Sequence, residues 1–118
     1  MKRIFIALVF LISLQITAQQ KTWSEDLITV PVKSNYQKTS TYAEVMSFIA
    51  ALQNKSDLMH LEYMGTSKEG KKIPLVILAN PKVSTPAEAI ASGKPVIYIQ
   101  GNIHSGEVEG KEIVQQIM

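Results

Sequence analysis

The feature that most constrains the fold of this chain is a short apolar run that ends at a glycine and is followed by an amphipathic pattern. Residues 96–99 read VIYI, and Gly101 and Asn102 interrupt the run. A continuous apolar run of this kind is typical of a strand that is buried on both faces, as in a parallel sheet covered by helices. The segment after Glu107 spaces apolar residues among charged and amide residues as a helix does (Val108, Ile113, Val114 and Ile117). Residues 95–118 therefore predict a strand, a turn and a helix, in that order.

The turn between these two elements carries a histidine and a glutamate three residues apart. His104 offers an imidazole nitrogen and Glu107 a carboxylate oxygen. Zinc binds both, and a zinc site with an open position activates water. In open α/β sheets, ligand sites lie beyond the carboxyl ends of strands, where this turn is expected. The pair alone is equally compatible with a structural role, in which His104 caps the strand and Glu107 favours a helix N-terminus through the macrodipole.

The preceding sequence predicts further elements of an α/β domain. Thr41 and Glu44 have capping-box spacing, and the apolar residues that follow at steps of three and four predict a helix over residues 42–52, with one face in the core (Tyr42, Val45, Met46, Ile49 and Leu52). Residues 59–64 and 73–79 predict two strands joined by a turn, and residues 86–93 predict a short helix opened by proline and closed by glycine. We expect an α/β fold: a mixed sheet with helices on both faces.

The second histidine, His60, lies in an alternating segment at residues 58–63 that predicts a strand. We expect its side chain on a face or edge of the sheet, bonded to water or to a neighbour, and not on a metal.

The first 18 residues predict a secretory signal peptide. Lys2 and Arg3 form a short positive region, residues 4–14 are an apolar run, and residues 16–18 precede Gln19 like a cleavage site. An uncleaved anchor is the competing interpretation, but the run is shorter than the ~20 apolar residues that a spanning helix needs. We expect a secreted or periplasmic protein with no membrane contact after cleavage, in which residues 19–40 form an extended lead-in.

Composition limits which classes of partner this chain can bind and which interactions can stabilise its fold. The net charge of +2 comes from 12 basic and 10 acidic residues, and loss of Lys2 and Arg3 with the leader removes it. With no basic patch interleaved with aromatic residues, we expect no nucleic-acid partner. The chain has no cysteine, so disulfides are excluded and stability depends on packing and metal.

The segment GNIHSGEVEGKE, residues 101–112, resembles the first metal-binding segment of the zinc carboxypeptidases, the funnelin-type metallopeptidases. Upstream, residues 42–52 resemble the early helix of that family. Residues 64–73 resemble its hairpin motif G-x-S-x-E-G-R-x-I, with Lys71 where arginine is usual. The resemblance extends over residues 39–118.

This resemblance implies that His104 and Glu107 are the first and second protein ligands of a catalytic Zn²⁺. It implies an exported zinc-dependent metallocarboxypeptidase that hydrolyses C-terminal peptide bonds of a peptide or protein substrate. Residues 41–118 would be the N-terminal part of its catalytic domain, a truncated portion of the zinc-carboxypeptidase-like fold. The family's third ligand, general base and substrate-clamping arginine have no counterpart here, so we expect an incomplete fragment that is inactive alone.

Two alternatives remain open at this point. One is a zinc-dependent N-acyl amino acid deacylase, a related branch with a similar His-x-x-Glu segment. The other is a secreted, non-catalytic pseudoenzyme that keeps the fold to bind peptides. The Ser-Gly-Glu sequence after His104 and the leader favour the peptidase. Histidine with carboxylate also suits other divalent metals, so the identity of zinc rests on the resemblance.

Overall fold

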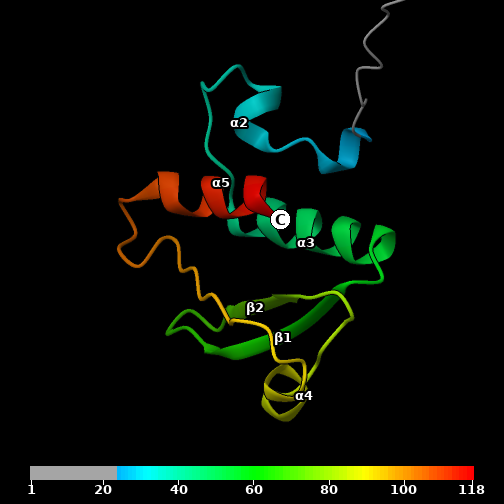
Figure 1. Cartoon of the computed structure of the whole chain (residues 1–118). Coiled ribbons are helices and arrows are strands. Elements are labelled where there is room, and N and C mark those ends of the chain that lie inside the picture. Colours follow the sequence, from blue (N-terminus) through cyan, green and yellow to red (C-terminus); the bar gives the residue numbers. More distant parts are fainter. Residues whose placement is uncertain (1–23) are drawn as a thin grey trace, which may run out of the picture.

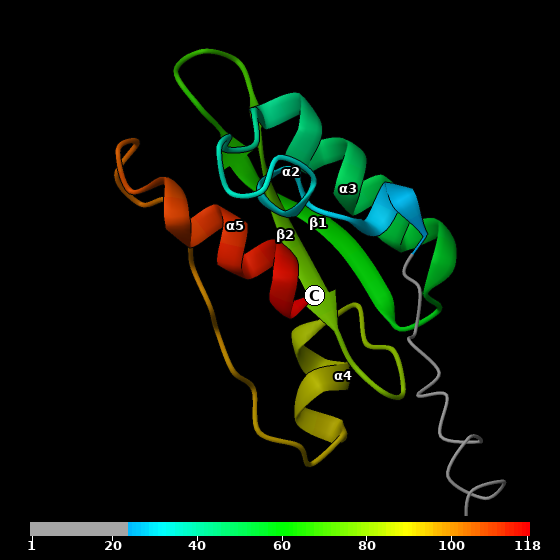
Figure 2. The same ribbon diagram turned by 90° about the horizontal axis from the view of Figure 1, so that it is seen from above.

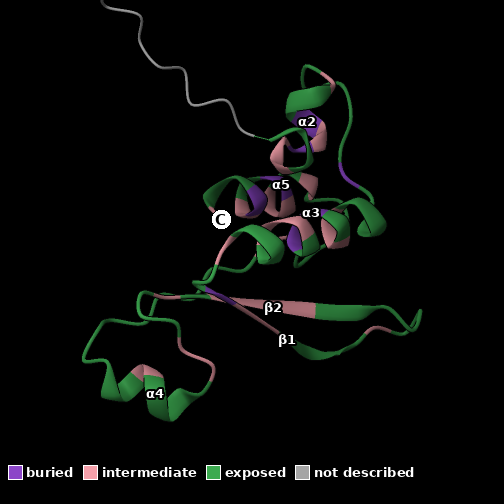
Figure 3. Ribbon diagram, turned by 90° about the vertical axis from the view of Figure 1, so that its right-hand side faces the viewer, coloured by how far each residue is buried: buried purple, intermediate pink, exposed green. Residues whose placement is uncertain are grey.

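The computed structural model describes residues 24–118, and the predicted signal peptide lies outside them. Two strands form an antiparallel hairpin, α3 and α5 lie side by side on one side of it, and α4 lies on the other side (Figures 1 and 3). The elements are η2 (Glu25–Leu27), α2 (Val30–Lys33), α3 (Tyr42–Lys55), β1 (Met59–Thr66), β2 (Lys72–Leu78), α4 (Pro86–Ala91) and α5 (Val108–Ile117). The predicted α/β class is confirmed.

Helix α3 begins as its sequence predicts. The Thr41 hydroxyl accepts a hydrogen bond from the Glu44 backbone N–H, and the Glu44 carboxylate accepts one from the Thr41 N–H at 2.7 Å. This capping box satisfies donors that an isolated helix end leaves unpaired. The helix continues to Lys55, three residues beyond the predicted end. Among the described residues, no helix is both long and apolar enough to cross a membrane.

The core lies where α3 meets β1. Met59 is fully buried, Ile49 is 2% exposed and Phe48 is 8% exposed. Burying a side chain of this size contributes roughly 1.5–3 kcal/mol, so these three residues anchor the helix on the hairpin. The predicted core face of α3 is buried at Ile49, but Tyr42 stays exposed and its hydroxyl donates to the Lys72 carbonyl at 3.0 Å.

The hairpin also follows the prediction. β1 pairs with β2 from Met59 opposite Leu78 to Thr66 opposite Lys72, with an irregularity between Tyr63 and Gly65. Pro74 lies at this irregularity, where its missing N–H is tolerated. In the turn, the Ser67 N–H donates to the Lys71 carbonyl at 2.8 Å, and Gly70 has a left-handed φ of 78°.

Helix α4 confirms the short helix predicted after β2. Its N-terminus has a second capping box, formed by Thr85 and Glu88, with Pro86 at the first helical position. Just after its end, Gly93 has a left-handed φ of 66°, as expected for a glycine that closes a helix.

The strand predicted at residues 96–99 does not form. Residues 94–100 have no regular secondary structure, and Val96 and Ile97 are 77% and 80% exposed. The segment and β2 line the same open groove, and Figure 2 shows the chain returning from α4 to α5 through this segment. Strands are stabilised by hydrogen bonds to a neighbouring strand, and within the described residues the sheet contains β1 and β2 alone. The apolar pattern is therefore that of a strand, but this segment has no partner here.

The lead-in also differs from the extended conformation expected of it. Residues 25–33 contain η2 and the single turn of α2, which begins with Val30 and has the buried Pro31 at its second position. Asp26 pairs with Lys55 at the end of α3, with 3.2 Å between carboxylate and ammonium. Ser40, 4% exposed, packs against α5. The described part of the lead-in therefore packs on both α3 and α5.

Candidate metal centre

His104 and Glu107 lie at the two ends of a tight turn that leads into α5. Glu107 is the residue just before the helix, and its backbone N–H donates to the His104 carbonyl at 3.0 Å. This bond folds the turn so that the two side chains point toward each other. His104 Nδ1 and Glu107 Oε1 are 2.9 Å apart. The structure therefore brings both predicted ligands together, and their binding of a metal stays a prediction.

Two glycines hold this loop against the first turn of α5. A methyl group at Gly101 would lie 2.5 Å from the Gly110 carbonyl oxygen, and one at Gly110 would lie 2.8 Å from the Asn102 nitrogen. Only glycine permits such a close approach of two backbones. Asn102 has a left-handed φ of 59°, a conformation that asparagine tolerates better than most residues. These residues therefore determine both the conformation of the loop and its close contact with α5.

The donor chemistry of the pair fits part of a zinc site. Both side chains are open to solvent, at 77% exposed for His104 and 63% for Glu107. The observed separation of 2.9 Å is that of a hydrogen bond. Two ligand atoms each about 2.1 Å from a tetrahedral ion are about 3.4 Å apart, so the two side chains would have to separate slightly to admit the ion. Within residues 24–118, no group of three or more His, Cys, Asp or Glu side chains is arranged to hold a metal. Among the described residues, the predicted zinc site therefore has two candidate donors, His104 and Glu107.

The His60 side chain bonds to a neighbouring side chain on its own strand, as expected. It lies on β1 opposite Ile77, and its Nε2 is 2.9 Å from Glu62 Oε1 on the same strand. The chain thus contains two histidine–glutamate pairs with the same separation, one on a strand and one in the turn before α5. His60 serves below as a matched control for His104.

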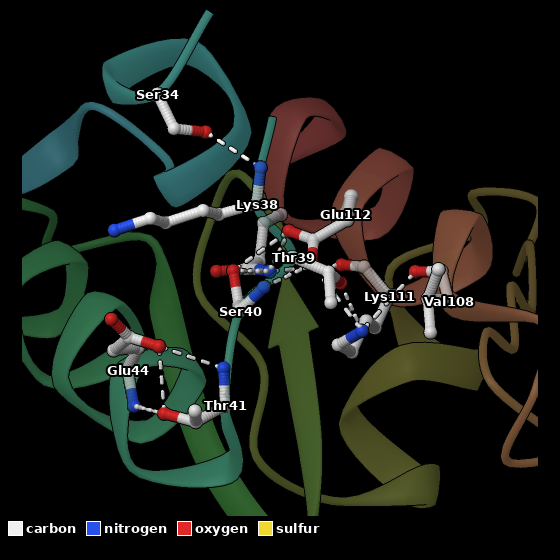
Figure 4. Close-up of polar contacts among 10 residues, drawn as sticks. Ser34, Lys38, Thr39, Ser40, Thr41, Glu44, Val108, Lys111 and Glu112 are labelled. Atoms are coloured by element: carbon white, nitrogen blue, oxygen red, sulfur yellow. Dashed lines mark hydrogen bonds and ion pairs between the residues drawn. The ribbon is translucent and has the colours of Figure 1, made fainter. Parts of the chain in front are cut away.

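A buried polar network, which was not predicted from the sequence, lies on the helix that follows the His104–Glu107 turn. Glu112 and Gln115 are the buried residues of α5, whereas Ile113 and Ile117 are more than half exposed. Glu112 accepts hydrogen bonds from the Thr39 hydroxyl and from the backbone N–H and hydroxyl of Ser40 (Figure 4). One signal was available: residues 108, 112 and 115 share a helix face, and hydroxyl residues occupy positions 39–41.

The Glu112 carboxylate is held in its charged form. Burial raises its pKa, but hydrogen bonds from Thr39, Ser40 and Lys111 together outweigh burial and bring the pKa below its ordinary value of 4.5. Lys111 Nζ lies 3.3 Å from the carboxylate. Near neutral pH, α5 is therefore joined to the segment that precedes α3 by hydrogen bonds to a charged carboxylate.

The family model for zinc carboxypeptidases matches residues 45–118, more than half of the chain. The chain belongs to the zinc carboxypeptidase family. The match runs from α3 through the hairpin and α4 to the end of α5 and includes the turn with His104 and Glu107. A search of curated proteins finds no match to this zinc carboxypeptidase chain.

Proposed function

We propose that this chain forms the N-terminal part of an exported zinc-dependent metallocarboxypeptidase that removes C-terminal residues from peptides or proteins. Membership of the zinc carboxypeptidase family supports a metallocarboxypeptidase-type function. The observation that carries the proposal is the family match over residues 45–118, which includes the solvent-exposed turn where His104 and Glu107 lie together. Export rests on the charged and apolar pattern of residues 1–18.

In this proposal, His104 and Glu107 hold the zinc ion through one nitrogen and one oxygen. When bound, zinc supplies a Lewis acid for the scissile carbonyl and lowers the pKa of a water molecule. Glu107 is engaged as a ligand, so a different carboxylate must accept the proton from water. A catalytic zinc takes three protein ligands. We therefore assign the third ligand, the general base and the group that binds the substrate carboxylate to other parts of the complete protein, and expect the 118-residue chain to be inactive alone.

The metal assignment is tested by zinc analysis of the complete protein and two histidine variants. We expect His104→Ala to lose bound zinc and activity, because it removes one of the ligand atoms. His60→Ala is the matched control, since it removes a histidine with the same 2.9 Å contact to a glutamate. A wild-type protein without zinc, or an H104A variant that keeps full zinc occupancy, would overturn the assignment.

The reaction is tested with three substrates under the same conditions. A peptide with a free C-terminal carboxylate should release its last residue, and the same peptide with an amidated C-terminus should not. An N-acyl amino acid should react much more slowly than the free peptide. Hydrolysis confined to the N-acyl amino acid would assign the deacylase function instead. Zinc binding without any hydrolysis would assign the binding function.

A further inference from the structure

Helix α5, which begins directly after Glu107, is docked on the rest of the fold through polar groups. Its buried side chains are Glu112 and Gln115, at 8% and 3% exposed. The apolar residues Ile113 and Ile117 are instead 54% and 59% exposed. Val108 and Val114 are partly buried and add some apolar contact, but the most deeply buried side chains are polar, so the position of the helix depends largely on the bonds that these two make.

Glu112 makes most of these bonds, and all its partners are donors. Its Oε1 accepts from the Thr39 hydroxyl and the Ser40 backbone N–H, each at 2.5 Å, and its Oε2 accepts from the Ser40 hydroxyl at 2.7 Å. Gln115 Nε2 donates to Oε2 at 3.1 Å, and the Lys111 ammonium lies 3.3 Å from Oε1. A carboxylate has about four acceptor positions, so this one is fully satisfied.

These bonds connect two parts of the chain that are far apart in sequence. Thr39 and Ser40 lie immediately before the capping residue of α3, which packs on the hairpin. Glu112 lies five residues after Glu107, about 7.5 Å along the helix axis. The turn with His104 is fixed to the same helix by the Gly101–Gly110 contact and by the His104–Glu107 backbone bond. A movement of α5 relative to α3 therefore carries both ligands with it.

We propose that Glu112 is a positioning residue of the zinc site, which sets the placement of His104 and Glu107 relative to the rest of the domain by fastening α5 to residues 39–40. The inference rests on the proposed zinc-binding function. Because the remaining ligands come from other parts of the protein, the zinc affinity depends on where α5 places the first two. Substitution of partners that orient metal ligands typically weakens metal binding by about 10–100-fold.

The variant Glu112→Gln tests this role, because it keeps the side-chain size and replaces one acceptor by an N–H donor. That donor faces the hydroxyl and amide groups that now donate to the carboxylate. The matched control is Glu109→Gln, the same change at an exposed position of the same helix. Ser40→Ala is a milder variant, which removes the two hydrogen bonds of the hydroxyl, to Glu112 and from Gln115, and leaves the backbone N–H in place.

The experiment measures the zinc dissociation constant of the complete protein by competition with a chromophoric chelator. The measurement is made at a temperature at which circular dichroism shows every variant folded. The absorption spectrum of the cobalt-substituted protein reports the ligand geometry. We expect E112Q to raise the dissociation constant about 10-fold and to alter the cobalt spectrum. E109Q should stay within about 2-fold of wild type, and S40A should fall between the two.

Each result decides the proposal. If E112Q and S40A lower the unfolding temperature but keep the wild-type zinc affinity and cobalt spectrum, Glu112 stabilises the fold only and the positioning role is wrong. An equal effect of E109Q would assign the change to helix charge and would also overturn it. If E112Q does not fold, S40A decides alone by the same two measurements. A wild-type protein that binds no zinc would overturn the proposed function itself.

Discussion

At Gly101 and Gly110 the loop that leads to His104 and the first turn of α5 approach so closely that a methyl group on either residue would meet backbone atoms. Backbone atoms cannot move aside as the end of a flexible side chain can, so a steric clash at this contact could not be relieved by a small local shift. The geometry of the His104–Glu107 turn therefore depends on two residues that take no part in binding chemistry.

We expect Gly110→Ala to destabilise the protein by about 1–3 kcal/mol, the usual cost of overpacking. Helix propensity alone predicts the opposite sign, a gain of about 1 kcal/mol for alanine over glycine within a helix. Urea denaturation of the variant and the wild type distinguishes the two. Gly106→Ala is the control, because a methyl group there has no atom within 4 Å. Equal stability of G110A and G106A would contradict the close contact.

At the scale of single elements, local sequence signals were reliable. The predicted capping box at Thr41 forms because it joins residues only three positions apart, and the box at Thr85, which was not predicted, has the same local spacing. The hairpin was predictable for the same reason, since its strands are joined by a short turn. The register irregularity near Met64 carries no such local signal.

The α3 capping box gives a direct test at this scale. Thr41→Ala removes the hydroxyl that accepts from the Glu44 N–H, and we expect it to lower the free energy of unfolding by about 1 kcal/mol. Thr41→Ser keeps the hydroxyl and should remain within a few tenths of wild type. Thermal unfolding followed by circular dichroism measures both. A serine variant as unstable as the alanine variant would assign the loss to packing of the threonine methyl group.

The docking of α5 should depend on pH. The pKa of Glu112 is lower in the folded protein than its ordinary value of 4.5, so the unfolded chain binds more protons in acid. The stability that Glu112 contributes is therefore present above pH 4.5 and is lost as the pH falls through its folded pKa. Lys111 and Glu44 also act on this carboxylate. Unfolding free energies measured from pH 7 to pH 3 should fall less steeply for E112Q than for wild type.

At the scale of the whole molecule, the features that could not be predicted from the sequence are those that depend on contacts between residues far apart in the chain. Residues 96–99 have the composition of a buried strand, but a strand also needs a neighbour, and pairing is not encoded locally. The Glu112 network joins residues more than seventy positions apart. A polar helix face is also a weak sequence signal that its side chains will be buried. His104 and Glu107 were recognisable as candidate ligands because residue type and spacing are local, and their binding of a metal stays a prediction.

The groove between β2 and residues 94–103 predicts a surface property of the 118-residue chain. Val96, Ile97, Tyr98 and Ile99 are each at least half exposed along it. Exposed apolar surface of this kind binds hydrophobic dyes and favours association. We expect Ile97→Asp to reduce the fluorescence of bound anilinonaphthalene sulfonate. Val32→Asp, at an exposed apolar position on α2 outside the groove, should leave it unchanged. Equal effects of both would contradict a localised apolar groove.

The bonds from Ser40 to Glu112 also set an order of events during synthesis. A ribosome delivers the N-terminal part of a chain first, and these two residues are 72 positions apart. The hairpin and α3 can assemble while the later codons are still being translated. The hydrogen bonds from Ser40 to Glu112 can form only after α5 has emerged from the ribosome. Closure of this long loop therefore follows the folding of α3 and the hairpin, and the His104–Glu107 turn reaches its place against them only then.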